Sequence, residues 1–284
     1  MNEIPVINHP FKWTVLILGL GFLYLPILSL IIYSFNENKL VTVWSEFSFK
    51  WYGELFRDQA LMEGILFSLT VGVLAASTAV VIGTVAGFVI TRFGKFKAEN
   101  SFALMITAPL VMPEVITGLS LMLLFISLGN VFDLFSNRGL HTVWIAHTTF
   151  CTAYVTVVVS SRLKELDLSI EEAAMDLGAP PWKTFFVITL PSILPAIIAG
   201  WLLAFTLSLD DLVIASFVSG PGATTLPMVV FSSVKLGVNP KINALSSIIV
   251  AVVSVAAFIA WWLMAKAEKR RLQEMQQLNA NIKS

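Results

Sequence analysis

Residues 162–195 read RLKELDLSIEEAAMDLGAPPWKTFFVITLPSILP, and they separate two long apolar stretches of the chain. Ser169 followed three residues later by Glu172 is typical of a capping box, which predicts a helix that begins at Ile170. Gly178 is placed to end this helix in the left-handed conformation, and the two prolines that follow prevent its continuation. Because the second proline can open another short helix, we expect a compact helix–turn–helix, called the knob below.

One face of the predicted helix in the knob is apolar. Four residues at helical spacing form this face: Ile170, Ala173, Ala174 and Leu177. An apolar stripe on a helix is stable only when it is buried against another surface. We therefore expect this stripe to pack either on the chain's own apolar segments or on a partner protein.

The rest of the chain is unusually apolar. Of its 284 residues 57% are hydrophobic and 13% charged, and the mean hydropathy is +0.83. Soluble domains carry roughly 25% charged residues, whereas six stretches here are long enough to cross the roughly 30 Å apolar core of a bilayer. Because they lack the alternating pattern of a membrane barrel, they are expected to be helices. The sequence thus predicts an all-α, polytopic membrane protein, a single transmembrane domain over residues 1–284 with spans at about 12–35, 65–91, 102–128, 142–161, 196–219 and 244–265.

The distribution of basic residues predicts the orientation of these spans. Cytoplasmic segments of membrane proteins are enriched in Lys and Arg. One set of connecting segments holds six basic residues: Lys39, Lys50, Arg57, Arg138, Lys235 and Lys241. The other set, which includes both ends of the chain and the knob, holds twelve: Lys12, Arg92, Lys95, Lys97, Arg162, Lys164, Lys183, Lys266, Lys269, Arg270, Arg271 and Lys283. We therefore expect both termini and the knob on the cytoplasmic side.

The loop also resembles a family signature. The positions that match the EAA signature of ABC importer permeases are Glu172, Ala173, Ala174, Gly178, Ile188, Leu190 and Pro191. Three further stretches are similar to the spermidine/putrescine branch of that family: WYGEL at 51–55, PLVMPE at 109–114 and TLSLDDLVIASFVSGPG at 206–222. The resemblance extends over nearly the whole chain.

This resemblance implies a type I importer fold and a set of partners. In the family the knob docks in a groove of an ATPase, so Glu172 is expected to make a polar contact there, Ala173 and Ala174 to pack in the groove, and Gly178 to allow the turn. The implied partners are a second, homologous permease subunit, an ATPase dimer, a periplasmic polyamine-binding protein and the lipid of a bacterial inner membrane. ATP and magnesium are expected to be used by the ATPase, so no cofactor is expected on this chain.

Several function classes lack support in the sequence. The net charge is zero, which gives no field to attract nucleic acid. The stretch from Gly87 to Lys95 lacks the glycine spacing and the hydroxyl residue of a phosphate-binding loop. His141 and His147 do not share a helix face, and Cys151 is expected to be a small buried hydrophobe, so neither a metal site nor an enzymatic site is predicted.

Three carboxylates lie inside predicted spans: Glu114, Asp210 and Asp211. A charge at the bilayer centre costs at least about 2.5–3.5 kcal/mol, so such residues face a protein interior or a water-filled path. With no Lys or Arg at that depth, the compensating cation is a partner residue, a proton or a cationic substrate. Adjacent residues do not share a helix face, so one aspartate can face the path while the other pairs with a neighbouring helix. Trp201 and Tyr154 are candidates for cation–π contacts.

Alternatives remain open at this point. The acids could instead hold the chain to a second permease, and the solute could be a different small molecule. An ion-coupled secondary transporter would also carry acids in its spans, although it would not need the knob.

Gly83 and Gly87 form a GxxxG pair, which predicts close packing of the second span on a neighbouring helix.

Overall fold

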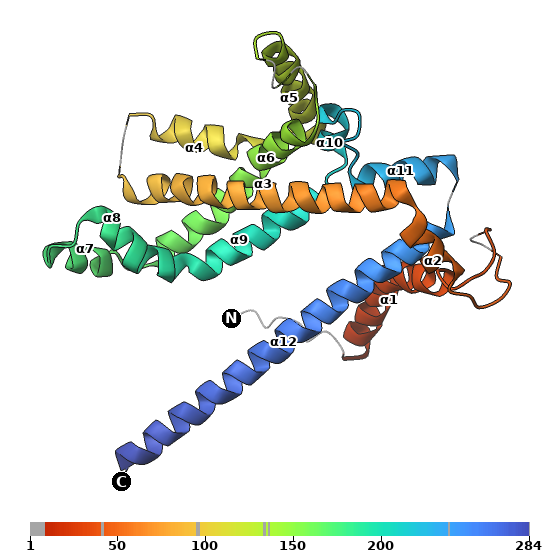
Figure 1. Ribbon diagram of the computed structural model, residues 1–284. Helices are drawn as coiled ribbons and strands as arrows, with labels where there is room; N and C mark the ends of the chain where they lie inside the picture. Colours follow the sequence, from red (N-terminus) through yellow and green to blue (C-terminus); the bar gives the residue numbers. More distant parts are fainter. Residues whose placement is uncertain are drawn as a thin grey trace. The chain divides into compact units, whose positions relative to one another are not determined.

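The computed structural model describes residues 9–40, 43–94, 97–132, 135, 137–237 and 239–283 (Figure 1). Its helices are α1 (His9–Tyr33), α2 (Lys50–Arg57), α3 (Gln59–Arg92), α4 (Glu99–Thr107), the 3-10 helix η1 (Ala108–Leu110), α5 (Glu114–Gly129), α6 (Leu140–Glu165), α7 (Leu168–Asp176), α8 (Pro181–Thr184), the π-helix η3 (Phe185–Thr189), α9 (Leu190–Asp210), α10 (Val213–Val218), α11 (Leu226–Leu236) and α12 (Pro240–Lys283). Within these ranges the β pairing is one bridge between Asn36 and Phe47. Lys95 lies outside the described residues, as do the side chains of Arg270, Arg271 and Lys283.

The chain divides into two compact units, residues 1–58 with 233–284 and residues 59–232. In the first unit α12 packs against α1 and α2. The connection between α1 and α2 folds around the buried Asn36, whose side chain bonds to the backbone of Val43 and Ser45 and whose carbonyl accepts the indole N–H of Trp51 at 2.6 Å. Lys241 on α12 pairs with Asp58 at 2.8 Å, which holds the end of α2 to α12.

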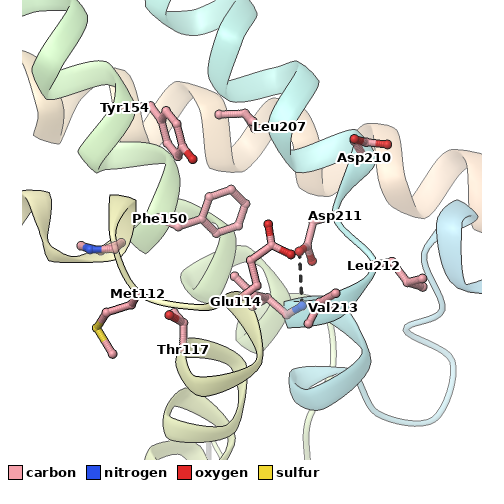
Figure 2. Close-up of a pocket in the computed structure, with 12 residues that line it drawn as sticks. Met112, Glu114, Thr117, Phe150, Tyr154, Leu207, Asp210, Asp211, Leu212 and Val213 are labelled. Carbon is pink, nitrogen blue, oxygen red and sulfur yellow. Dashed lines mark hydrogen bonds between the residues drawn. The ribbon is translucent and has the colours of Figure 1, made fainter.

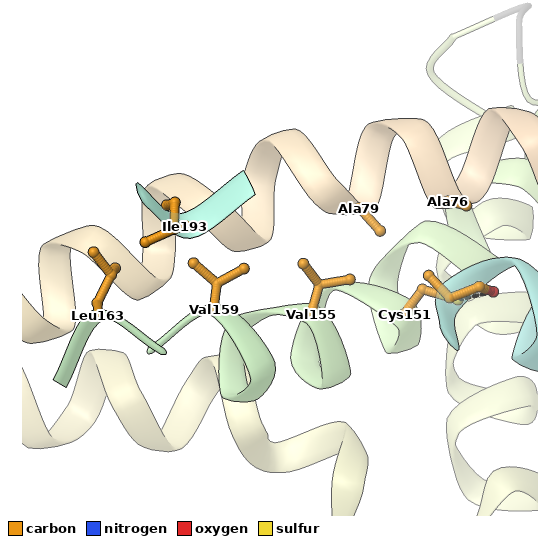
Figure 3. Packing of buried hydrophobic residues seen from close by; sticks show 8 residues of the cluster. Ala76, Ala79, Cys151, Val155, Val159, Leu163 and Ile193 are labelled. Atoms are coloured by element: carbon orange, nitrogen blue, oxygen red, sulfur yellow. Dashed lines mark hydrogen bonds between the residues drawn. The ribbon is translucent and has the colours of Figure 1, made fainter. Parts of the chain in front are cut away.

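The core of the second unit is formed by α3, α6 and α9, which pack on one another. Figure 3 shows Val155 and Val159 of α6 pointing toward small residues of α3, among them Ala79. Cys151 is fully buried in the same cluster, as expected. Because lipid is as apolar as these side chains, helix association in a membrane depends on close packing rather than on the hydrophobic effect.

The GxxxG pair of α3 lies where this packing is closest. A Cβ atom at Gly83 would lie 2.8 Å from Cγ1 of Val155, and one at Gly87 would lie 3.3 Å from the backbone nitrogen of Ser160. A Cβ atom at Gly83 would overlap the side chain of Val155, and one at Gly87 would be in tight contact with the backbone of α6. The predicted close packing of this span is therefore confirmed, and its neighbour is α6.

Five helical segments among the described residues are long and apolar enough to cross a membrane: Phe11–Tyr33, Gln59–Arg92, Leu140–Glu165, Pro181–Asp210 and Pro240–Lys266. The segments Glu99–Leu110 and Glu114–Gly129 are together apolar enough for a sixth span, but they form a bent pair whose halves meet at 108°. The predicted span 102–128 is thus interrupted after η1. Pro113 precedes α5 and supplies no backbone N–H, which removes one hydrogen bond of a continuous helix at this point.

The expectation that Asp210 and Asp211 lie inside one continuous helix over 196–219 is wrong. The helical segment begins at Pro181, ends at Asp210 and is followed by the separate short helix α10. The backbone of Asp211 does not continue α9. Its carboxylate accepts hydrogen bonds from backbone N–H groups in the first turn of α10. The two acids therefore lie at a break between helices.

Candidate functional site

The knob consists of α7, a turn and α8, residues 168–184. Its first helix begins earlier than the Ser169–Glu172 pair predicts. Asp167 is the N-cap, and its Oδ1 accepts the backbone N–H of Ser169 at 3.0 Å. This hydrogen bond holds the pKa of Asp167 below its ordinary value, because it stabilises the charged carboxylate. The predicted capping box is wrong because an aspartate two residues upstream supplies the cap, which leaves Ser169 inside the helix.

The end of α7 follows the prediction. Gly178 has a φ of +87°, the left-handed conformation that favours glycine. Its N–H donates to the carbonyl of Met175 at 2.9 Å, and the N–H of Ala179 donates to that of Ala174 at 3.0 Å. These two bonds form a Schellman motif. Pro181 then occupies the first turn of α8, so the predicted turn and second helix are confirmed.

The apolar stripe of the knob does not pack on the chain's own spans. Ile170 is 55% exposed and Leu177 is 90% exposed, and α7 contains no buried residue. Glu172 and Ala173 are also exposed, and Ala174 is half-buried. The described residues of this chain therefore do not cover the stripe, and a partner protein remains the expected surface.

The remaining signature residues follow the turn and lead into the bundle. Ile188 and Leu190 are half-buried, and Leu190 packs against the core cluster of α3, α6 and α9. Pro191 is exposed in the first turn of α9. Since α9 has 21 residues, it connects the knob to Asp210 over about 30 Å of continuous helix.

A cavity of about 190 Å³ lies at the far end of α9 (Figure 2). It is lined by all three carboxylates predicted from the sequence, together with Tyr154 and Phe150 of α6. Glu114 reaches it as the first residue of α5, directly after the bend at Pro113, and Asp210 as the last residue of α9. Among the described residues that line it there is no Lys or Arg.

Asp211 is the structural member of this acidic group. Its carboxylate accepts hydrogen bonds from the backbone N–H groups of Ile214 at 3.2 Å and Ala215 at 2.7 Å, and Oδ2 lies 3.2 Å from Nε2 of His147. The residue is only 9% exposed. Two backbone N–H groups of α10 therefore hold this buried carboxylate, and the ring of His147 lies against it.

His147 is a functional candidate that the sequence analysis missed. From the sequence it is a candidate only for metal binding, and the bases that the sequence offers against the acids are counted as Lys and Arg alone. The structure buries it completely, with Nδ1 at 2.7 Å from Oγ of Ser208 and Nε2 facing Asp211. Beside Asp211 the structure thus places an imidazole, a group that the count of Lys and Arg does not include. The spacing of 64 residues between His147 and Asp211 gave no signal of their contact.

Asp210 and Glu114 differ from Asp211. Both side chains are exposed toward the cavity, and in the part of the chain that the structure describes neither makes a hydrogen bond or an ion pair. Tyr154 lies on the same cavity, as Figure 2 shows, but Trp201 does not. The indole of Trp201 donates to Oγ of Ser77 at 3.1 Å and stacks on Phe205, so it is not brought to the acids.

A second, more open hollow of about 470 Å³ lies beside the first, and Pro109 lines both. Its lining is mainly apolar, with Thr78, Thr149, Thr152 and Trp144 among residues such as Ile82 and Met105. Trp144 donates its N–H to Thr78 at 3.1 Å, which leaves the aromatic face for contact. The acidic cavity thus has a mainly apolar neighbour without Lys, Arg, Asp or Glu among the described residues of its lining.

Comparison with known proteins agrees with this arrangement. A family model described as binding-protein-dependent transport system inner membrane component matches residues 79–273. The chain is 63% identical to the putrescine transport system permease protein PotI of Escherichia coli strain K12, over 97% of this chain and 98% of that protein. It is 38% identical to the spermidine/putrescine transport system permease protein PotC of the same strain, over 87% of this chain and 90% of that one.

Solved structures show the same fold. A chain of a bacterial ABC transporter involved in the import of the acidic polysaccharide alginate aligns with a TM-score of 0.69, covering 93% of this chain and 99% of that one at 15% identity. The alginate transporter in complex with a periplasmic protein bound to an alginate pentasaccharide aligns with a TM-score of 0.68 at 17% identity, over 87% and 90%. At such identities the likeness establishes the architecture alone.

Proposed function

Because this chain belongs to the family of binding-protein-dependent transport system inner membrane components, we propose that it is a permease subunit of an ATP-driven importer for putrescine or spermidine. The observation that carries the substrate class is the cavity at the end of α9. Glu114 and Asp210 face it without a partner among the described residues, and no Lys or Arg lines it. The 63% identity to a putrescine permease supports the same class.

The chemistry of a polyamine fits two separated carboxylates better than one. A diamine carries an ammonium group at each end of an apolar chain, so each end can bind one acid while the methylene groups lie against Phe150 and Leu207. Tyr154 offers an aromatic face and a hydroxyl group to an ammonium group. Carboxylates within a membrane span are tolerated when they are wet, paired or neutralised, and a bound dication neutralises both.

The transport cycle requires partners. We assign ATP and magnesium to an ATPase dimer that docks on the exposed stripe of the knob, with Glu172, Ala173, Ala174 and Gly178 at the contact. A second, homologous permease completes the path, and a periplasmic binding protein delivers the substrate. ATP binding favours the outward-open state and hydrolysis resets it. The knob and both termini face the cytoplasm of a bacterial cell, and no cofactor is assigned to this chain.

The direct test is uptake of labelled putrescine and spermidine, with choline as an unrelated cation, in cells that carry the reconstructed operon with and without this chain. We expect uptake of at least one polyamine to require the chain and to cease when the partner ATPase carries an inactivating substitution. Uptake that continues without ATP hydrolysis would instead indicate an ion-coupled transporter. If no polyamine uptake depends on the chain, the substrate is another small solute and the proposal fails.

A further inference from the structure

Glu171, the neighbour of the signature glutamate, connects α7 to two other helical segments. Its carboxylate receives two side-chain donors of Arg92, the last residue of α3: Nε lies 3.1 Å from Oε2, and Nη2 lies 3.2 Å from Oε1. Oε1 also accepts the hydroxyl of Thr189 at 3.1 Å. Thr189 is the last residue of the π-helix η3 and directly precedes α9. One carboxylate thus meets the ends of two spans.

This contact is shielded from water. The side chains of Arg92 and Glu171 are 8% and 12% exposed, and Thr189 is 1% exposed. Two-donor pairs between guanidinium and carboxylate are the strongest ion pairs of proteins and fix the relative orientation of the two groups. In a shielded site, removal of one partner leaves an uncompensated charge. The geometry of the pair is therefore much more restrictive than that of an exposed ion pair.

The pair is also the main polar attachment of α7 to the bundle. Since α7 buries no residue, little apolar packing holds it. In the described part of the chain, every side-chain hydrogen bond that leaves α7 for another helix passes through Glu171. The polar attachment of α7 to α3 and η3 therefore depends on the carboxylate of Glu171. The apolar stripe of α7 takes no part in it and stays exposed.

We infer that Arg92 and Glu171 are positioning residues that tie the knob to α3 and to the start of α9, so that movement of the knob displaces both spans together. The π-helix η3 lies where such a displacement enters α9, and π segments are frequent at functional sites because their wider turn is easily rearranged. The inference rests on the proposed function, since it concerns how ATPase movement reaches the spans. It assigns roles to two residues outside the EAA signature.

The chain provides a matched control. Arg162 and Glu165, just before the knob, form an ion pair of 2.9 Å within a single turn of α6, and their side chains are 43% and 66% exposed. Exposed pairs of this kind contribute little. Glu165→Gln removes one negative charge six residues before Glu171, as Glu171→Gln does at the knob. It breaks no hydrogen bond between different helices among the described residues. A role in local charge alone predicts equal effects of the two variants.

The experiment measures substrate imported per ATP hydrolysed in liposomes that contain the full transporter. In Glu171→Gln and Arg92→Gln we expect the ATPase to co-purify and to hydrolyse ATP at the wild-type rate or faster, with the ratio lowered at least tenfold. Glu165→Gln should keep the wild-type ratio. The double variant Arg92→Glu with Glu171→Arg should restore the ratio to within threefold. Unchanged ratios in both single variants, or parallel losses of uptake, hydrolysis and ATPase binding, would overturn the positioning role.

A second readout does not depend on the substrate. Spin labels at the exposed positions Phe93 and Asp176 report the separation of α3 from the knob, while the buried Cys151 stays unlabelled. We expect the dipolar broadening to be the same with and without ATP in the wild-type chain, and to fall in Glu171→Gln when ATP is added. Equal broadening in both chains would contradict the inference. If the wild-type transporter imports no polyamine, the proposed substrate fails, and this second readout still decides the role of the pair.

Discussion

Nε2 of His147 lies 3.2 Å from Oδ2 of Asp211, and both side chains are almost fully buried, at 0% and 5% exposed. The contact joins α6 to the break between α9 and α10. The other ring nitrogen of His147 lies 2.7 Å from Oγ of Ser208, so the ring is held on both sides. Both aspartates line the cavity, but Asp211 is held by these contacts whereas the side chain of Asp210 is exposed.

Asp211→Asn and His147→Ala should therefore reduce stability rather than substrate affinity. The asparagine amide presents donors where Asp211 accepts backbone N–H groups, and the alanine leaves a buried carboxylate without its nearest side chain. We expect each to destabilise the subunit by about 1–3 kcal/mol, seen as a lower Tm of the purified transporter in lipid nanodiscs. Uptake should fall with the amount of assembled transporter while its KM stays unchanged. A raised KM with normal Tm in Asp211→Asn would make Asp211 a substrate ligand instead.

Asp210→Asn and Glu114→Gln should weaken substrate binding without loss of assembly. Each substitution keeps the size of the side chain and removes the charge that faces the cavity. A hydrogen bond to a charged group is worth about 1.5–3 kcal/mol, so we expect KM for putrescine uptake to rise roughly tenfold or more. ATPase activity and recovery of the second permease should be normal. Asp210→Glu is the matched control that keeps the charge. Normal KM in both neutral variants and in their double variant would exclude these residues from substrate binding.

Substitution of Gly178 should act through the backbone of the turn. No atom lies within 4 Å of the position that its Cβ would take, so a side chain meets no obstacle and only the left-handed conformation is unfavourable. We expect Gly178→Ala to cost about 1–2 kcal/mol and Gly178→Asn to cost less, because asparagine tolerates this conformation. Recovery of the ATPase with the affinity-purified permease should follow the same order.

Charge changes on the knob should abolish transport while membrane insertion stays intact. Glu172 is exposed beside the stripe, so Glu172→Lys reverses a charge at the proposed docking surface without disturbing the fold. Gly178→Asp adds a charge next to it, and comparison with the uncharged Gly178→Asn separates the charge from the turn. Normal uptake together with normal ATPase recovery in Glu172→Lys and Gly178→Asp would contradict the docking role.

The topology predicts the activity of reporter fusions. With both termini in the cytoplasm, an alkaline phosphatase domain fused after Ser284 should be inactive, because it matures only in the periplasm. The same domain inserted at Gly222, in the turn between α10 and α11, should be active. The predicted orientation follows from twelve basic residues against six. The reverse pattern of activity would place the knob outside the cell and remove the proposed ATPase contact.

Local features of this chain could be predicted because their causes are local. The turn at Gly178 requires only a residue that tolerates a positive φ, and the opening of α8 requires only a proline at the first helical position. The close packing of Gly83 and Gly87 follows from the absence of side chains. The exact start of α7 was not predicted correctly, because both Asp167 and Ser169 can cap a helix and Asp167 is the residue that does so.

The sequence by itself determined the all-α membrane architecture, the knob and the three acids, because apolar length, turn residues and charge each act within a few residues. Only the tertiary structure decided which aspartate is held by hydrogen bonds and which glutamate anchors α7. Asp211 is separated from Asp210 by a single peptide bond, and its role depends on His147, 64 positions away. Glu171, and not the adjacent Glu172, anchors α7 because it contacts Arg92, which is 79 positions away. Partners so distant in the chain leave no periodic pattern, because only the packing of helices that are far apart in the sequence brings them together.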